Sequence, residues 1–408
     1  MNREDFNVLN SGVIYFDNGA TTLKPLILSE AISDYYNNYS SNAHRGDYQM
    51  SIKASSMYEE TRSIVKMLIN SKSEKQISFT SGTTDSINKI VFGYFAKVLS
   101  AGDEVLLTKS EHASNLLPWF ELADKKDLKI KYIPLDDNHE ISIDNLKKTI
   151  TDKTKVISIA HVSNVVGDVR PVKEIVEYAH KKGILVLIDG AQSVPHLKID
   201  VQDIDMDFLV FSAHKMCGPT GVGVIYVNDR LLNEIDPIIY GGGMNADFST
   251  DGSRVYKTMP DRLEAGTPNI AGVIGFGYVI KYLMNIGFDK IHSYEISLKK
   301  YAISRLKEID KIKIYNENSE SGIITVNYDK IFPQDLAIYL DKYNIYTRAG
   351  SHCAKILKDE INIKNTLRIS LYFYNSKEEI DKLVDTLKNP NIIEEIIWFL
   401  FCLIKLIN

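Results

Sequence analysis

The chain has 408 residues, of which 44% are hydrophobic and 25% charged, and its formal net charge is −5 at pH 7. These values are typical of a soluble globular protein with a large and a smaller domain, and they give no electrostatic reason to expect nucleic acid. Three cysteines cannot form a disulfide framework, and the N-terminal MNREDFNVLN lacks the apolar core of a signal peptide, so we expect a cytoplasmic protein.

The first stretch with a chemical signal is FTSGTTDSINKIVFGYFAKVL, residues 79–99, which predicts a helix. Its apolar residues recur at helical spacing, and SGTT directly precedes them. Thr83 and Thr84 then lie at the helix N-terminus, where free amides, the helix dipole and hydroxyl groups favour a phosphate group. For SGTT taken alone, simple N-capping is the favoured explanation.

Four continuous apolar runs in the middle of the chain, at 155–162, 184–189, 206–213 and 221–227, are rich in β-branched residues and predict strands. RPVKEIVEYAHKKG, residues 170–183, predicts a helix between the first two, with proline in its first turn and glycine at its C-terminal cap. Strands of this kind separated by helices indicate an α/β fold with a mostly parallel sheet covered on both faces.

Polar residues follow three of these predicted strands, and ligands bind parallel sheets beyond the carboxyl ends of the strands. Asn164 follows the first run, Asp189 ends the second, and FSAHK places Lys215 after the third. A buried carboxylate needs a partner, and a protonated ring nitrogen of a cofactor is one; a helix cap or an ion pair is an equal alternative for Asp189. A partly desolvated lysine has a lowered pKa and bonds covalently to carbonyl groups. Lysine, aspartate and a phosphate-binding helix end together are what pyridoxal phosphate requires.

The pattern changes beyond about residue 290. Residues 288–309 predict a long helix, 321–328 and 366–374 predict short strands, and SKEEIDKLVDTLKN predicts a closing helix with Ser376 as its N-cap. This part of the chain is predicted to form a smaller α+β domain.

YTRAGSHCAKIL, residues 346–357, places Cys353 beside His352 in a loop of this smaller domain. A reactive thiol, half of a metal site and a small apolar residue are the three alternatives. No further ligands at a useful spacing accompany the pair, so we expect no metal. A role as a small apolar residue suits Cys217, two residues after Lys215, better than it suits Cys353.

The sequence resembles the SufS-type cysteine desulfurases, also called selenocysteine lyases, within the class V aminotransferase family of fold-type I pyridoxal phosphate enzymes. The resemblance begins with IYFDNGATTLKP at residue 14 and extends to about residue 388. It continues in order through NAHRG, SGTTDSIN, EHASNLLPW, HVSNVVGDVRPV, DGAQSVPH, DFLVFSAHKMCGPTGVGVIY, YGGGM, RLEAGTPN, RAGSHCA and RISLYFYN. It implies a large domain with a mostly parallel sheet between helices and a smaller C-terminal α+β domain.

The resemblance also implies which residues bind pyridoxal 5'-phosphate. Lys215 would hold the cofactor and move the substrate's Cα proton, Asp189 would pair with the ring nitrogen, and His112 would stack on the ring. Gln192 would bond the phenolic oxygen, with Asn164 close by. The phosphate would be bound by residues of both subunits of a homodimer: Thr83, Thr84, Ser212 and His214 from one, and Thr267 from the other.

For the substrate L-cysteine, the resemblance implies that Arg368 clamps the carboxylate, a task suited to a bidentate guanidinium. His44, Asn164 and Arg348 would also line the pocket. Cys353 would attack the substrate's sulfur and hold it as a persulfide, leaving L-alanine, and a small acceptor protein would receive the sulfur for iron–sulfur cluster assembly. The alternatives are a selenocysteine lyase or another class V pyridoxal phosphate enzyme; a non-catalytic scaffold is less consistent with the residues retained.

The expected organisation has four parts. They are an N-terminal segment associated with the small domain (1–20), a large cofactor-binding domain (21–288), a small domain carrying the Cys353 loop (289–388) and an apolar extension (389–408).

Two features depart from the family's pattern. The common motif has threonine and histidine where this chain has Ala349 and Ser351, which removes one titratable group beside the thiol. The extension contains an unbroken apolar run from Ile396 to Ile404, which is too short to span a membrane. We expect this run to dock on the protein, in preference to a membrane surface or to self-association.

Overall fold

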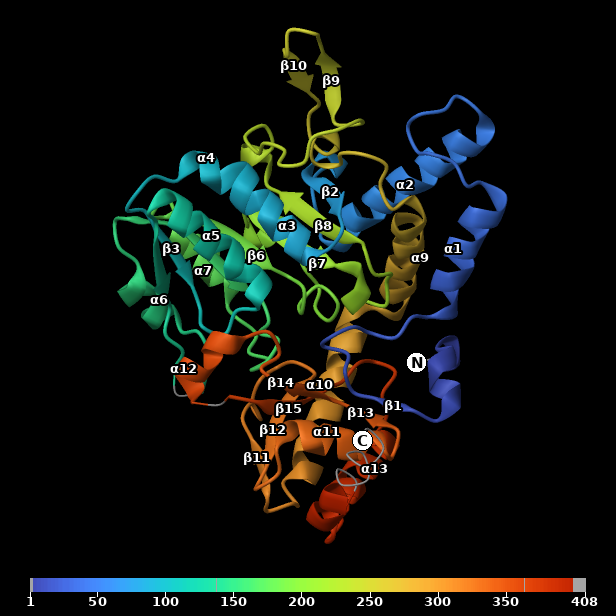
Figure 1. Cartoon of the computed structure of the whole chain (residues 1–408), viewed down its shortest axis with the longest axis vertical. Helices are drawn as coiled ribbons and strands as arrows, with labels where there is room; N and C mark the ends of the chain where they lie inside the picture. The colour runs from blue at the N-terminus through green and yellow to red at the C-terminus, as the bar shows by residue number, and fades with distance from the viewer. Residues whose placement is uncertain (1–2, 137, 363, 399–408) are drawn as a thin grey trace, which may run out of the picture.

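A seven-stranded sheet forms the centre of the computed structural model, which describes residues 3–136, 138–362 and 364–398 (Figure 1). In spatial order its strands are β2 (Ile77–Thr80), β8 (Gly223–Val227), β7 (Phe208–Ser212), β6 (Leu185–Asp189), β5 (Thr154–Ala160), β3 (Glu104–Leu107) and β4 (Lys129–Tyr132). The strands from β7 to β4 run parallel, whereas β8 is antiparallel to both β7 and β2. The mostly parallel α/β sheet predicted from the apolar runs is therefore confirmed.

Helices cover both faces of this sheet, because successive side chains of β7 pack alternately against helices on one face and on the other. Phe208 and Val210 belong to a buried cluster with residues of α3 (Thr83–Ile90) and α5 (Leu117–Lys126). Leu209 and Phe211, whose side chains point to the opposite face, belong to a cluster with residues of α7 (Val172–His180) and α9 (Ile270–Ile286). A strand buried on both faces must be apolar at every position, which is why the predicted strands are continuous apolar runs.

Two predicted helices differ in detail from the structure. The helix predicted over 79–99 begins as α3 but continues after Ile90 as a π-helical segment (Val91–Phe95) and then as α4 (Ala96–Val98). The helix predicted over 170–183 extends from Val172 to His180, with Pro171 just before it and Gly183 beyond it at a φ of 69°. The other helices of this part are α1 (Leu26–Asn38), α2 (Gln49–Leu68), α6 (Ile143–Thr149) and α8 (Val201–Ile204).

The chain after α9 packs beneath the large sheet in Figure 1. Its four-stranded sheet has the order β11 (Ile312–Ile314), β12 (Ile323–Tyr328), β15 (Thr366–Ser370) and β14 (Arg348–Gly350), all antiparallel. Its helices are α10 (Phe288–Leu306), α11 (Pro333–Asp341), α12 (Lys358–Ile361) and α13 (Lys377–Leu387). The predicted N-cap Ser376 is confirmed, because its side chain accepts from the Glu379 amide in a capping box.

The strand predicted over 366–374 is too long, since β15 ends at Ser370. Residues 373–374 form a turn, within which the Asn375 side chain accepts a hydrogen bond from the Tyr372 amide at 2.8 Å.

The N-terminal segment joins the C-terminal part of the fold. Its short strand β1 (Ile14–Tyr15) pairs in parallel with β13 (Ile345–Tyr346). Farther on, Asp17 forms an isolated parallel bridge with Ser370. A separate hairpin, β9 (Asn245–Phe248) with β10 (Arg254–Tyr256), projects from the opposite end of the molecule (Figure 1). The domain limits at residues 20, 288 and 388 stay a prediction.

Part of the C-terminal extension lies within the described chain. Residues 392–398 are helical, and Ile392 and Ile396 are buried in the hydrophobic cluster that also contains residues of α11 and α13. The rest of the predicted docking run, residues 399–404, lies outside the described residues. Among described residues no single helix is long and apolar enough to cross a membrane; only α9 and α10 together, bent by 71°, reach that length and composition.

Candidate active site

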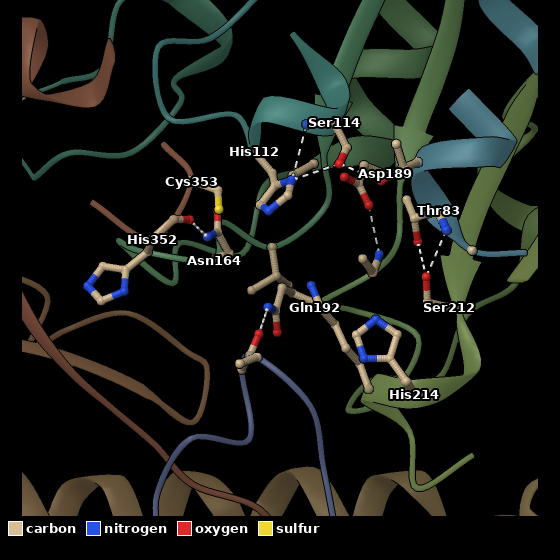
Figure 2. Close-up of a pocket in the computed structure, with 18 of the residues that line it drawn as sticks. Thr83, His112, Ser114, Asn164, Asp189, Gln192, Ser212, His214, His352 and Cys353 are labelled. Carbon is tan, nitrogen blue, oxygen red and sulfur yellow. Dashed lines mark hydrogen bonds between the residues drawn. The ribbon is translucent and has the colours of Figure 1, made fainter. Parts of the chain in front are cut away.

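A cavity of about 450 Å³ lies beyond the carboxyl ends of β5, β6 and β7, and residues of β14, of β15 and of the loop between them line its other side. Figure 2 shows this cavity in close-up. It brings together most of the residues predicted from the sequence. They are Thr83, Thr84, His112, Asn164, Asp189, Gln192, Ser212, His214, Lys215, Arg348, Cys353 and Arg368. The position follows from the topology, because parallel strands deliver their following residues to one edge of the sheet.

Asp189 and Lys215 lie in this cavity at the ends of neighbouring strands. The Ala191 amide donates to Oδ1 of Asp189 at 2.9 Å. Burial raises the pKa of the Asp189 carboxyl to about 6. Burial likewise lowers the pKa of the Lys215 ammonium to about 8, although the Asp189 carboxylate acts in the opposite direction. Burial thus makes both charged forms costly, and a ligand with a protonated ring nitrogen and an aldehyde would relieve both costs. The donor set therefore fits pyridoxal 5'-phosphate.

Hydroxyl groups surround the N-terminus of α3, which opens into the cavity. Ser212 Oγ accepts from the Thr83 amide at 2.8 Å and lies 2.6 Å from Thr83 Oγ1. Thr84 Oγ1 lies 2.7 Å from Oγ of Ser114, a neighbour not predicted from the sequence. Burial lowers the pKa of the nearby His214 to about 4, so this ring is neutral near pH 7. Hydroxyls, amides and a helix N-terminus together fit the phosphate group of the cofactor.

His112 caps the short 3₁₀ helix Ala113–Asn115 and lines the same cavity. The Ser114 amide donates to its Nδ1 at 3.1 Å (Figure 2). Since Nδ1 accepts, the proton of the neutral imidazole is assigned to Nε2. Burial, with a contribution from Lys215, lowers the pKa of His112 to about 4. A neutral ring held in this way is suited to stacking on an aromatic cofactor.

Arg368 lies on β15 directly opposite Arg348 of β14, so both guanidinium groups belong to one pair of adjacent strands. Arg368 is 2% exposed. Its Nη1 donates to the main-chain carbonyl of Asn164 at 2.8 Å, and its Nη2 lies 3.2 Å from Oδ1 of Asp17. Nε of Arg368 is buried and has no hydrogen-bond partner in the described chain. An unsatisfied donor on a buried cation is the feature expected where an anionic ligand binds.

Cys353 is exposed and lies at the edge of the cavity. His352 and Cys353 have φ angles of 51° and 60°, in the left-handed region that non-glycine residues rarely adopt. The His352 ring points away from the thiol (Figure 2), and its Nε2 lies 2.9 Å from Thr366 Oγ1. Among the described residues no group of three or more potential metal ligands occurs. Cys217, by contrast, is fully buried, and burial raises its pKa to about 12.

Two predicted residues do not line the cavity of this single chain. His44 is half-exposed, and its Nε2 lies 3.2 Å from Oε1 of Glu59. Thr267 is exposed, and its Oγ1 accepts from Asn42 at 3.4 Å. A role for Thr267 in the phosphate site of a second subunit stays a prediction.

Sequence reasoning missed a buried network behind the cavity. Arg170 is bonded to Glu111, and its Nε lies 3.1 Å from Oδ2 of Asp168. Glu111 also accepts from the Ala160 amide at 2.8 Å, so it ties the end of β5 to the loop that carries His112. Glu111 and Arg170 belong to stretches that support the resemblance, but nothing in the sequence around either residue indicates that the two side chains pair. Asp17 was missed in the same way.

Comparisons with known proteins agree with this arrangement. Residues 14–383 match the family described as "Aminotransferase class-V". A "Probable cysteine desulfurase" from Halalkalibacterium halodurans is 42% identical over 384 residues, covering 94% of each chain. The apo structure of a cysteine desulfurase from Thermococcus onnurineus NA1 superposes with a TM-score of 0.91 at 37% identity, over 95% of this chain and 96% of that one. The cysteine desulfurase CsdA (S-sulfonic acid) from Escherichia coli superposes with a TM-score of 0.90 at 33% identity, over 96% and 97%.

Proposed function

The chain belongs to the aminotransferase class-V family, and from this premise we propose that it is a pyridoxal 5'-phosphate-dependent cysteine desulfurase. It converts L-cysteine to L-alanine and holds the sulfur as a persulfide on Cys353. The observation that carries the proposal is the convergence of Lys215, Asp189, Arg368 and Cys353 on one cavity. The aminotransferase family alone would account for the first three, whereas an exposed thiol at the cavity edge is what sulfur transfer requires.

Lys215 and Asp189 would hold the cofactor at its aldehyde and at its ring nitrogen, respectively. Bound pyridoxal 5'-phosphate supplies an electron sink that makes the Cα proton of an amino acid removable. Asp189 would pair with the ring nitrogen and keep it protonated, because a buried carboxylate is stabilised by a cationic partner. Nζ of Lys215 would hold the cofactor at its aldehyde carbon and would also be the base that takes the substrate's Cα proton. Its lowered pKa of about 8 leaves part of the amine unprotonated near neutral pH.

The remaining cavity residues orient the cofactor and the substrate. His112 would stack on the ring, and Gln192 would bond the phenolic oxygen, with Asn164 close by. Thr83, Thr84, Ser212 and His214 bind the phosphate, and Thr267 of a second subunit completes this site in a homodimer. Arg368 binds the substrate's carboxylate through donors that include its unpartnered Nε, with Arg348 and His44 at the rim of the pocket.

Cys353 carries out the sulfur transfer. Its thiolate attacks the sulfur of bound cysteine, so an S–S bond forms as the substrate's Cβ–S bond breaks. The electron pair of the broken bond goes to Cβ, which takes up a proton and becomes the methyl group of L-alanine. The outer sulfur of the persulfide then passes to a small acceptor protein, as the S–S bond breaks and the Cys353 thiolate is restored. Iron–sulfur cluster assembly in the cytoplasm is the proposed destination of this sulfur.

Mass spectrometry of the cofactor-loaded protein after exposure to L-cysteine tests the proposal. We expect one added sulfur on the peptide containing Cys353, none on the peptides containing Cys217 or Cys402, and stoichiometric alanine. Cys353→Ala should keep the yellow colour of the bound cofactor and lose the added sulfur. Normal sulfur transfer by this variant would overturn the assignment of the nucleophile. Faster turnover of L-selenocysteine than of L-cysteine would instead favour the selenocysteine lyase alternative.

A further inference from the structure

The loop that carries Cys353, residues 350–357 and here named the thiol loop, is bonded to the large sheet's side of the cavity at two consecutive carbonyl groups. The side-chain Nδ2 of Asn164 donates to the main-chain carbonyl of His352 at 2.7 Å (Figure 2). The main-chain amide of Ala113 donates to the carbonyl of Cys353 at 2.8 Å. Both donors lie in segments that follow strands of the large sheet, and both acceptors flank the thiol.

The thiol loop needs such support because its conformation is unfavourable. His352 and Cys353 are both in the left-handed region, and neither is glycine. Backbone strain of this kind persists when surrounding contacts hold it, and it is relieved when they are lost. Within the loop, the Ala354 amide donates to the Ser351 carbonyl at 2.9 Å, but that bond does not fix the loop against the cavity.

Asn164 connects the thiol loop to the other small-domain group in the cavity. Its side chain is buried and holds His352, whereas its main-chain carbonyl accepts from Nη1 of Arg368 at 2.8 Å. One residue in the loop after β5 therefore contacts both the cation proposed to bind the substrate's carboxylate and the loop of the proposed nucleophile.

We propose that Asn164 is a positioning residue for sulfur transfer, because its side-chain amide, together with the Ala113 N–H, clamps the thiol loop so that Cys353 stands beside the cavity. This inference rests on the proposed function only in taking Cys353 as the sulfur acceptor. It differs from the cofactor- and substrate-binding role that the resemblance implies for Asn164. When both bonds are released, the strained backbone of residues 352 and 353 relaxes and the thiol moves outward.

Three substitutions separate the clamp from other effects. Asn164→Ala removes the side-chain donor but keeps the main-chain carbonyl that accepts from Arg368. Gln192→Ala is the matched control, since Gln192 is also a cavity amide but donates to the Gly19 carbonyl at 2.7 Å and does not bond the thiol loop. Ala113→Pro removes the second donor, the main-chain N–H of residue 113, and leaves the side-chain amides of Asn164 and Gln192 in place. Proline fits there because Ala113 is the first residue of a 3₁₀ helix and His112 before it has φ −65° and ψ 147°.

Hydrogen exchange followed by mass spectrometry on the cofactor-loaded proteins is the test. We expect exchange across residues 350–357 to be about tenfold faster in Asn164→Ala and in Ala113→Pro, the effect of losing one hydrogen bond. Gln192→Ala should stay within about twofold of the wild type. Exchange in Asn164→Ala within that same margin, or an equal acceleration in Gln192→Ala, would overturn the proposal.

A kinetic measurement distinguishes positioning from general damage to the site. In single turnovers, Asn164→Ala should transfer sulfur to Cys353 about tenfold more slowly, while the cysteine concentration at half-saturation changes less than about twofold, because the Arg368 contact is kept. A change confined to half-saturation contradicts the clamp. If no sulfur reaches Cys353 even in the wild type, the proposed function fails, whereas the exchange result still decides whether the clamp exists.

Discussion

Oδ1 of Asp17 lies 3.2 Å from Nη2 of Arg368, so the guanidinium proposed to bind the substrate's carboxylate already has a carboxylate beside it. Burial raises the pKa of Asp17, and the attraction of Arg368 and Arg348 opposes that rise. Asp17 comes from the N-terminal segment and Arg368 from β15. The pair holds one edge of the guanidinium and leaves Nε free for a ligand. We therefore expect Asp17 to orient the guanidinium and also to compete with the substrate's carboxylate for it.

We expect Asp17→Asn to bind cysteine more tightly, because an uncharged amide no longer competes for Arg368. KM should fall by about three- to tenfold, which corresponds to about 1 kcal/mol for a partly exposed ion pair. Steady-state kinetics at low and high salt measure the effect, and salt should reduce it. A KM that is unchanged or raised contradicts competition and leaves orientation as the role of Asp17.

Removal of the cofactor should expose the cost of burying the Asp189 carboxylate. Its pKa is raised from 3.8 to about 6 in the folded protein. A raised folded-state pKa gives a favourable contribution below pH 3.8 that is lost as the pH rises through 6. Cofactor-free Asp189→Asn should therefore be more stable than the cofactor-free wild type at pH 7, by about 1–3 kcal/mol. The gain falls to about 1 kcal/mol if Asp189→Asn also loses a substantial attraction between the carboxylate and Lys215.

Urea unfolding of both cofactor-free proteins from pH 4 to pH 8 provides the measurement for Asp189. The difference in the free energy of unfolding should close towards pH 4, where the wild-type carboxyl is neutral. A difference that is constant across this range would mean that ionisation of Asp189 is not its source.

His112 should affect the pH dependence of the free energy of unfolding in the direction opposite to Asp189, destabilising the folded protein at low pH. Burial lowers its pKa from 6.5 to about 4, so its contribution to stability is complete above pH 6.5 and lost as the pH falls through 4. We expect His112→Gln to lose about 1–3 kcal/mol less stability than the wild type between pH 7 and pH 4. Urea unfolding at several pH values measures this.

His44 offers a control for the His112 experiment. Its hydrogen bond to Glu59 raises its pKa, so its contribution is present below pH 6.5 and lost as the pH rises. His44→Gln should therefore lose stability at low pH relative to the wild type. The same direction of change in both variants would contradict these assignments.

The C-terminal extension should contribute to stability through one side of its helical residues. Ile396 is 7% exposed and Ile397 is 63% exposed, although they are adjacent in the sequence. Ile396→Ala should cost about 2–4 kcal/mol in the free energy of unfolding, and Ile397→Ala less than about 0.5 kcal/mol. Urea unfolding of the two variants compares them directly. Equal effects would mean that the extension does not pack on the small sheet and its helices.

The central sheet and the floor of the site were predictable because they follow from simple patterns. Continuous apolar runs identify strands buried on both faces, and the residues after such strands meet at one edge. This pattern alone indicates Asp189 and Lys215 as candidate site residues. The antiparallel direction of β8 was not predictable, since an apolar run is the same in either direction.

The resemblance added residues whose local sequence carries no chemical signal, among them Arg368 and Gln192. Neither the sequence patterns nor the resemblance indicated which hydrogen bonds and ion pairs keep the site residues in position. The left-handed backbone at Cys353 occurs without a glycine, because hydrogen bonds from elsewhere in the chain stabilise it. Asp17 and Arg170 have their partners far away in sequence, and such pairings appear only in three dimensions.

The pairing of β1 with β13 has a consequence for the order in which this molecule is completed during synthesis. Ile14 emerges from the ribosome long before its partner Ile345 has been made. Lys215, Asp189 and the start of α3 are also made well before Arg368 and Cys353. Because domains fold as units from the N-terminal end, the residues proposed to bind the cofactor are synthesised first. At that stage β1 has no partner strand, since β13 has not yet been made. The thiol proposed to receive sulfur, that of Cys353, is among the last parts of the site to be synthesised.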